Sequence, residues 1–254
     1  LLEIKCEVSD FELEHSILVG NLKIIQMLLD AGYIYHNNCL VIACESHNNA
    51  IVEYLVKCGC ELTEECLERA LRANCIETIY YLIKKGVIIN NWSLYYAVLF
   101  CDMDVLVFIK QYSRFIPICY MAAIRKKSKV LLDFLYEDSV EMDMAVFSNA
   151  ISVGQKWIWD YLVERGCPFG PETYSTAVIS NNIDAMDYLD NLNCRKSLDC
   201  LITAIKYSDV KTISILCSRI REYRLIWSRS SLDPVLKRRN EKEVDYIIKE
   251  FFID

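Results

Sequence analysis

Glycine, proline and histidine are scarce in this sequence. It holds seven glycines, four prolines and three histidines among 254 residues, whereas average usage gives about 12% for glycine and proline together. All-β folds need a turn roughly every ten residues, and nucleotide-binding loops need clustered glycines. The scarcity therefore argues against both and favours helices joined by short turns.

Long apolar runs are also missing. The longest uninterrupted run is Phe115–Ile124, and it contains Pro117, whereas a membrane-spanning helix needs about 20 apolar residues. The sequence thus predicts no membrane segment. Hydrophobic residues nevertheless make up 54% of the chain, which is ample for a large core in one or two domains. With 28 basic and 35 acidic residues, the formal net charge is −7.

The thirteen cysteines form an odd set without the Cys-x2-Cys pairs of a zinc site. We therefore expect free thiols and a reducing compartment, the cytoplasm. The chain opens on Leu-Leu-Glu-Ile without an initiator methionine. Leu1 and Cys6 match the repeat phases of Leu55 and Cys60, so we expect residues 1–8 to be the remnant of an upstream repeat.

A repeat of about 27 residues runs through most of the chain. Its anchoring turn recurs at intervals of 27 residues, once 26, at Gly20, His47, Asn74, Cys101, Lys127, Gly154, Asn181 and Ser208. Four residues before the turn stand small residues, namely Ser16, Ala43, Ala70, Ala97, Ala123, Ala150, Ala177 and Ala204. Eight residues after it stand Leu28, Leu55, Leu82, Ile109, Leu135, Leu162, Leu189 and Leu216. Eight units sharing this pattern predict a stack of helix pairs, since no single pair could bury its own apolar stripe.

The glycines and prolines indicate where these helices end and begin. Twelve residues after the turn, the eight units carry Gly32, Gly59, Gly86, Ser113, Ser139, Gly166, Asn193 and Ile220. Helices commonly end on a left-handed residue, for which Gly and then Asn are favoured. Each unit is therefore predicted to run as helix A, tight turn, helix B and left-handed stop. Pro117, Pro171 and Pro234 stand where a helix A begins, which is the position that proline tolerates best.

The segment from His47 to Cys60, His-Asn-Asn-Ala-Ile-Val-Glu-Tyr-Leu-Val-Lys-Cys-Gly-Cys, resembles the turn, second helix and stop of an ankyrin repeat. Ankyrin repeats run to 33 residues and carry Thr-Pro-Leu-His before the helix A alanine; here the period is shorter and that signature is absent. The short period, with Gly166-Cys167-Pro168-Phe169, is similar to divergent ankyrin-type repeats of large DNA viruses of amoebae. The multigene-family proteins of African swine fever virus are a looser second match.

This resemblance predicts an all-α, ankyrin-like solenoid with short loops and little or no β-hairpin. Eight helix-pair repeats would occupy residues 9–218, and residues 219–254 would form a basic insertion and a C-terminal capping repeat. Because the loops are too short for β-hairpin fingers, helix A would supply most of the concave binding face.

By the same analogy, residues just before each turn would point into the concave face and bind a partner. The candidates are Arg72, Leu99, Phe100, Arg125, Lys126, Ser152, Lys206 and Tyr207. An apolar patch at Leu99 and Phe100, flanked by cations, would suit an acidic, hydrophobic peptide, because aromatic and arginine side chains commonly dominate interfaces. The alternative is that all of them are ordinary solvated helix ends.

A second basic patch lies near the C-terminus. It comprises Arg219, Arg221, Arg224, Trp227, Arg229, Lys237, Arg238 and Arg239. Basic clusters interleaved with aromatics can bind single-stranded nucleic acid. The net charge of −7 argues against that partner, and a solvated C-terminal cap explains the patch equally well.

The cysteines and the aromatic phase have simple structural interpretations. Cys44, Cys60, Cys167 and Cys194 are expected to be small buried hydrophobes, and His47, in a turn, fits no Cys–His catalytic geometry. One residue before the leucine phase stand Met27, Tyr54, Tyr81, Phe108, Phe134, Tyr161, Tyr188 and Ile215, which we expect to belong to the core.

The sequence thus favours a non-enzymatic protein-interaction scaffold without a cofactor, a viral protein acting on a host or viral protein in the host cytoplasm. A virion-associated protein that joins coat subunits is the alternative, and nucleic-acid binding through the basic clusters is less favoured. The pattern identifies neither the partner nor the oligomeric state.

Overall fold

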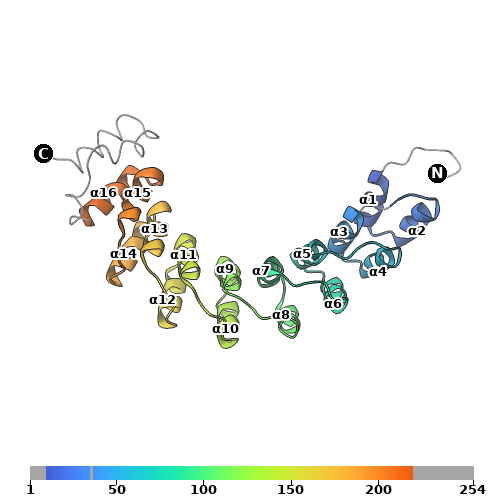
Figure 1. Cartoon of the computed structure of the whole chain (residues 1–254), viewed down its shortest axis with the longest axis horizontal. Coiled ribbons are helices and arrows are strands. Elements are labelled where there is room, and N and C mark those ends of the chain that lie inside the picture. The colour runs from blue at the N-terminus through green and yellow to red at the C-terminus, as the bar shows by residue number, and fades with distance from the viewer. Residues whose placement is uncertain (1–9, 35–36, 220–254) are drawn as a thin grey trace. The chain divides into compact units, whose positions relative to one another are not determined.

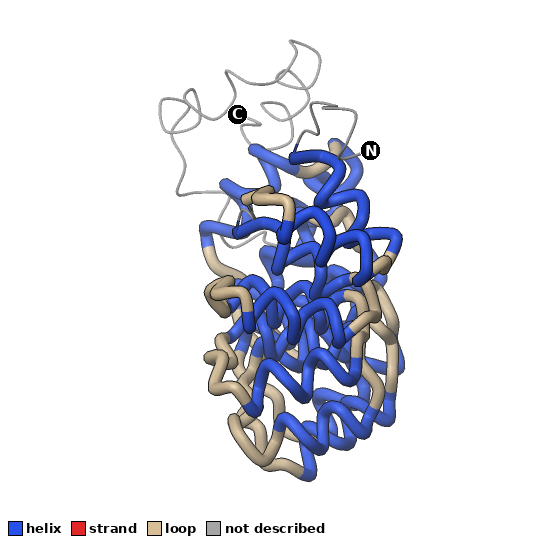
Figure 2. Tube along the Cα trace, turned by 90° about the vertical axis from the view of Figure 1, so that its right-hand side faces the viewer, coloured by secondary structure: helices blue, strands red, loops and turns tan. Residues whose placement is uncertain are grey.

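The computed structural model describes residues 10–34 and 37–219, and over these residues the protein is all-helical (Figure 2). This part of the chain contains sixteen α-helices and no β-strand. The prediction of an all-α protein is thereby confirmed for the described residues. None of these helices is long and apolar enough to cross a membrane.

The chain divides into two compact units, Leu1–Val140 and Glu141–Asp254. Unit 1 holds the helices α1 (Asp10–Val19), α2 (Leu22–Asp30), α3 (Asn37–Glu45), α4 (Asn49–Lys57), α5 (Glu64–Arg72), α6 (Ile76–Lys84), α7 (Asn91–Phe100), α8 (Met103–Ile109), α9 (Ile118–Arg125) and α10 (Lys129–Glu137). Unit 2 holds α11 (Met144–Val153), α12 (Lys156–Glu164), α13 (Pro171–Ile179), α14 (Ile183–Asn191), α15 (Leu198–Tyr207) and α16 (Val210–Arg219). Residues 1–8 and 220–254, for which a remnant repeat and a capping repeat are predicted, lie outside the described residues.

Within each unit, every second helix packs against the next of its kind. In unit 1, α1, α3, α5, α7 and α9 contact one another in that order, and each of them also contacts the even-numbered helix that follows. In unit 2 the order is α11, α13 and α15. Figure 1 shows α3, α5, α7 and α9 along one side of unit 1 and α4, α6, α8 and α10 along the other. The odd-numbered helices are those for which the sequence predicts helix A.

The small residue predicted in each helix A is buried where these helices meet. The seven alanines at that position have no exposed surface, and Ser16 is 8% exposed. A larger side chain would separate helices that pack this closely. The burial that this packing role requires is confirmed.

Most of the predicted left-handed stops are found, and most of the tight turns hold a left-handed residue as well. The backbone φ angle is positive at Gly20, His47, Asn74, Lys127, Gly154 and Asn181 in the turns, and at Gly32, Gly59, Gly86, Ser139, Gly166 and Asn193 at the helix stops. Pro171 is the first residue of α13, and Pro117 directly precedes α9.

The expectation of a left-handed stop is wrong at Ser113, and two of the tight turns differ in conformation from the others. Cys101 and Ser208 are extended, with φ of −90° and −95°, and their buried side chains donate to the carbonyls of Leu71 and Val178. The extended conformation brings each buried thiol or hydroxyl to a carbonyl acceptor, and we infer that this hydrogen bond favours it over the left-handed conformation. At Ser113, the backbone N–H bonds to Ile109 four residues back, which continues the helical turn.

The expectation that the aromatic phase belongs to the core needs correction. Tyr161 is buried, but Tyr54, Tyr81, Phe134 and Tyr188 are only half-buried. These rings lie at the flank of the even-numbered helices, where a tyrosine can bury its ring and keep its hydroxyl near polar groups. Tyr188 illustrates this, since its hydroxyl donates to Asp160 at 2.8 Å.

Candidate partner-binding surface

An aromatic surface runs along α7, a helix without a single charged residue. Trp92, Tyr96 and Phe100 are spaced four residues apart, which places them on one helix face. The ring centroids of Trp92 and Tyr96 are 6.1 Å apart, as are those of Tyr96 and Phe100. Trp92 is 54% exposed, Phe100 is 42% exposed and Tyr96 is half-buried. We call these three residues the α7 strip.

The buried side chain of Tyr95 packs against this strip. It is only 7% exposed, and its ring centroid lies 5.8 Å from that of Trp92 and 5.7 Å from that of Tyr96. Its hydroxyl accepts a hydrogen bond of 2.9 Å from Nη1 of Arg125 in α9. The strip therefore rests on a buried aromatic side chain that is tied to the neighbouring helix.

Cations lie beside the strip. The guanidinium carbon of Arg72, at the end of α5, is 5.5 Å from the centroid of the Tyr96 ring. Arg125 ends α9 and Lys126 follows it, and both are exposed. Among the described residues, none of these three cations forms an ion pair with a carboxylate. Since α7 contacts both α5 and α9, its neighbours hold Arg72 over the Tyr96 ring and Arg125 at the hydroxyl of Tyr95.

Carboxylates near the start of α7 are engaged within the protein. Asn90, the residue before α7, donates to Glu64 at 2.6 Å and to Glu68 at 3.0 Å. Arg69 bonds to Glu45 and also lies within ion-pair distance of Glu65. The Trp92 end of the strip therefore lies next to Asn90 and its two carboxylate partners, whereas unpaired cations accompany the rest of it. The surface has an electrostatic polarity.

The structure brings together only some of the residues predicted to bind a partner. Arg72 and Phe100 both lie against the ring of Tyr96. Arg125 is linked to them because it bonds to Tyr95, whose ring lies beside that of Tyr96. Leu99 is half-buried and Lys126 is exposed next to Arg125.

The remaining three predicted residues belong to unit 2. Lys206 and Tyr207 are the exposed last residues of α15. Ser152 is exposed as well, and its hydroxyl bonds to the carbonyl of Asn149 in its own helix.

Sequence reasoning missed Trp92, Tyr95 and Tyr96. Analogy directs attention to the two residues before each turn and so leaves out the earlier turns of the same helix. The available signal is the spacing of four residues between Trp92, Tyr96 and Phe100 in a segment without charge.

Only Arg219 of the predicted C-terminal basic patch is described, and it is engaged internally. Its Nη1 donates to Asp190 at 2.8 Å, and its Nη2 pairs with Asp187. The other residues of that patch, from Arg221 to Arg239, lie outside the described residues.

The eleven described cysteines form no disulfide, and all but Cys58 are buried. Cys167 donates its thiol proton to the carbonyl of Asp143, and Cys194 to that of Gly170. Burial raises the pKa of Cys167 to about 12 and that of Cys194 to about 11. These contacts support the structural interpretation of both cysteines.

Cys44 and Cys66 form a buried pair of thiols. The hydrogen bond from Cys44 lowers the pKa of Cys66 to about 6, and the same contact raises the pKa of Cys44. Neither side chain has exposed surface, so a substrate has no access to the sulfur of Cys66.

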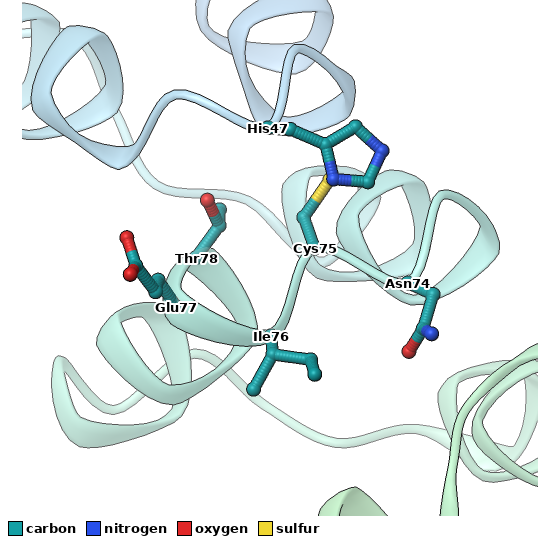
Figure 3. Close-up of a pocket in the computed structure, with 6 residues that line it drawn as sticks. All are labelled: His47, Asn74, Cys75, Ile76, Glu77 and Thr78. Carbon is teal, nitrogen blue, oxygen red and sulfur yellow. The ribbon is translucent and has the colours of Figure 1, made fainter.

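A small open pocket of about 250 Å³ lies between the α3–α4 turn and the start of α6 (Figure 3). His47 comes from that turn, and Cys75 is the residue before α6. Cys75 is 3% exposed, and burial raises the pKa of its thiol. A nucleophilic cysteine needs the opposite shift, so this arrangement does not support a Cys–His pair.

The described residues contain no group of three or more His, Cys, Asp or Glu side chains placed to hold a metal ion. No family model matches the sequence, and no curated protein shows significant similarity to it.

Proposed function

We propose that this protein is a non-enzymatic scaffold that binds another protein through the helix A side of an ankyrin-like array. The support for the array is the order of helix contacts, the buried alanines and the recurrent left-handed turns. Stacked helix pairs of this kind present rigid surfaces, and a rigid surface loses little conformational entropy when a partner binds. In this proposal the chain is viral and acts in the cytoplasm of the host cell.

The α7 strip is the observation that carries the proposal. Two exposed aromatic side chains and the half-buried ring between them form a contiguous apolar surface beside three unpaired cations. Aromatic and arginine side chains are the residues most enriched where protein interfaces concentrate their binding energy. A solvated helix end needs neither the aromatic continuity nor the buried support of Tyr95.

The proposal is tested by affinity capture of the tagged full chain from nuclease-treated cell lysate. The wild type is compared with Arg125→Glu combined with Lys126→Glu, and Lys156→Glu in α12 serves as the charge-reversal control. We expect proteins captured by the wild type and by the control to be reduced at least tenfold with the double variant. Equal recovery with the double variant would remove this surface from the proposal, and a wild type that captures no protein would contradict the scaffold function.

A further inference from the structure

We infer that the α7 strip binds a short acidic segment of the partner protein, with apolar side chains on the rings and carboxylates at Arg72, Arg125 and Lys126. The inference rests on the proposed function and adds the chemistry and the orientation of the segment. The strip spans eight residue steps, which is about 12 Å along the helix. An extended peptide covers that length with about four residues.

The apolar half of the inference follows from the exposure of the rings. Trp92 and Phe100 retain 54% and 42% exposure although both α5 and α9 pack against their helix. Adjacent aromatic rings at 6.1 Å leave a continuous face for aliphatic or aromatic side chains. Desolvation of that face supplies the binding free energy.

The acidic half follows from charge complementarity. Arg72, Arg125 and Lys126 have no carboxylate partner among the described residues, whereas Glu64 and Glu68 near the other end are held by Asn90. A carboxylate of the partner can form charge-assisted hydrogen bonds with the two guanidinium groups. We therefore place the acidic residues of the segment toward the Phe100 end of the strip.

The same polarity disfavours single-stranded nucleic acid. A nucleic-acid strand carries a phosphate at every nucleotide, so binding along the strip would bring phosphates toward Glu64 and Glu68 at the Trp92 end. The net charge of −7 adds general repulsion. A peptide can confine its charge to one end, as this surface requires.

The test selects ligands for the full chain from a displayed library of random dodecapeptides. We expect the selected peptides to combine Asp or Glu with Leu, Ile, Phe or Trp. Binding of a selected peptide, measured by fluorescence anisotropy, should weaken at least tenfold with Trp92→Ala plus Phe100→Ala. It should change less than twofold with Trp157→Ala plus Ile179→Ala, which removes two exposed apolar side chains from unit 2.

Reversing the charges on both the protein and the peptide separates a loss of binding from a loss of folding, because an unfolded variant would not gain affinity for the reversed peptide. Arg125→Glu plus Lys126→Glu should weaken binding of the acidic peptide at least tenfold. The same variant should bind more tightly a counterpart peptide in which Lys replaces the acidic residues. Selection of basic peptides, or unchanged binding in the Trp92 and Phe100 variant, would overturn the inference and leave the scaffold function standing. A fluorescent oligothymidylate that bound through the strip more tightly than the peptide would overturn it as well. If no peptide were selected and no protein captured, both would fail.

Discussion

Helices α7 and α13 meet the same packing demand and present different surfaces. Each carries a fully buried alanine, Ala97 and Ala177, against its neighbouring helices. Counted back from the turn residues Cys101 and Asn181, the positions of Phe100, Tyr96 and Trp92 correspond in α13 to Ser180, Thr176 and Glu172.

The hydroxyl groups at two of these positions bond to backbone carbonyls of α13. The hydroxyl of Thr176 donates to the carbonyl of Glu172 at 3.1 Å, and that of Ser180 to the carbonyl of Thr176 at 2.8 Å. Such local bonds leave little need for an external partner. The comparison shows that helix packing constrains the buried face and leaves the outer face free, so the exposed aromatic side chains of α7, Trp92 and Phe100, are not required by the fold.

We expect the largest effect from alkaline pH, which should lower the free energy of unfolding of both units because their buried cysteines ionise. Burial raises the pKa of Cys119 in unit 1 to about 11 and that of Cys194 in unit 2 to about 11. In the unfolded chain these thiols ionise near their ordinary pKa, about 8.5. Between the two values the native state binds more protons than the unfolded state, so stability is complete below pH 8.5 and falls as pH rises toward 11.

We expect the melting temperature to fall clearly from pH 8 to pH 10, since each pH unit in this window costs about 1.4 kcal/mol per such cysteine. Thermal unfolding followed by circular dichroism measures the change. Cys119→Ala and Cys194→Ala should each make the fall smaller. If the melting temperature of both variants fell as much as that of the wild type, these thiols would not be the groups that titrate.

The shared packing of the two helices predicts the next largest effect. Ala97→Leu and Ala177→Leu should each overpack the contact with neighbouring helices and destabilise the protein by roughly 1–3 kcal/mol. Urea unfolding measures the loss. Ala50→Leu, at an exposed position of α4, is the control and should change stability little. Unchanged unfolding of either core variant would contradict the common packing role.

The two extended turns predict a smaller effect. Ser208→Ala removes a buried hydroxyl that donates to Val178 at 2.7 Å, and we expect a loss of about 1 kcal/mol in urea unfolding. Cys101→Ala, which removes a thiol donor at 3.4 Å from the carbonyl of Leu71, should cost less because a thiol is a weak donor. Ser152→Ala, at an exposed helix end, is the control. A cost for Cys101→Ala larger than for Ser208→Ala would contradict this explanation of the turns.

The smallest expected effect on stability comes from exchanging the outer residues. Phe100→Ser at the end of α7 and Ser180→Phe directly after α13 should each change the free energy of unfolding by no more than about 0.5 kcal/mol, since both positions are exposed. Partner capture should decrease only for Phe100→Ser. A large loss of stability in that variant would assign Phe100 to the fold instead of to binding.

The sequence predicted the parts of the structure that depend on periodic packing. The all-helical architecture, the buried alanines and the proline at the start of α13 all follow from local preferences repeated along the chain. The conformation of Cys101 and Ser208 did not follow, because it depends on a carbonyl about 30 residues earlier. The role of Arg219 also depends on residues far away in sequence, the aspartates of α14.

The candidate surface was only half predictable. Phe100, Arg72 and Arg125 were found because they stand at helix ends. Trp92 and Tyr96 were missed because an aromatic residue at helical spacing is usually part of a core, and only the packing of α7 against α5 and α9 shows that this face is left open. Periodicity predicts which face of a helix is buried, but the exposed face must be read from the contacts.

Hydrogen exchange on the full chain, with and without a saturating dodecapeptide selected on the wild type, tests the central claim most directly. We predict that bound peptide slows exchange in α7 and in the adjoining ends of α5 and α9, and leaves α13 and α15 unchanged. Protection confined to α13 and α15, or spread evenly over both units, would contradict the assignment of partner binding to the aromatic face of α7.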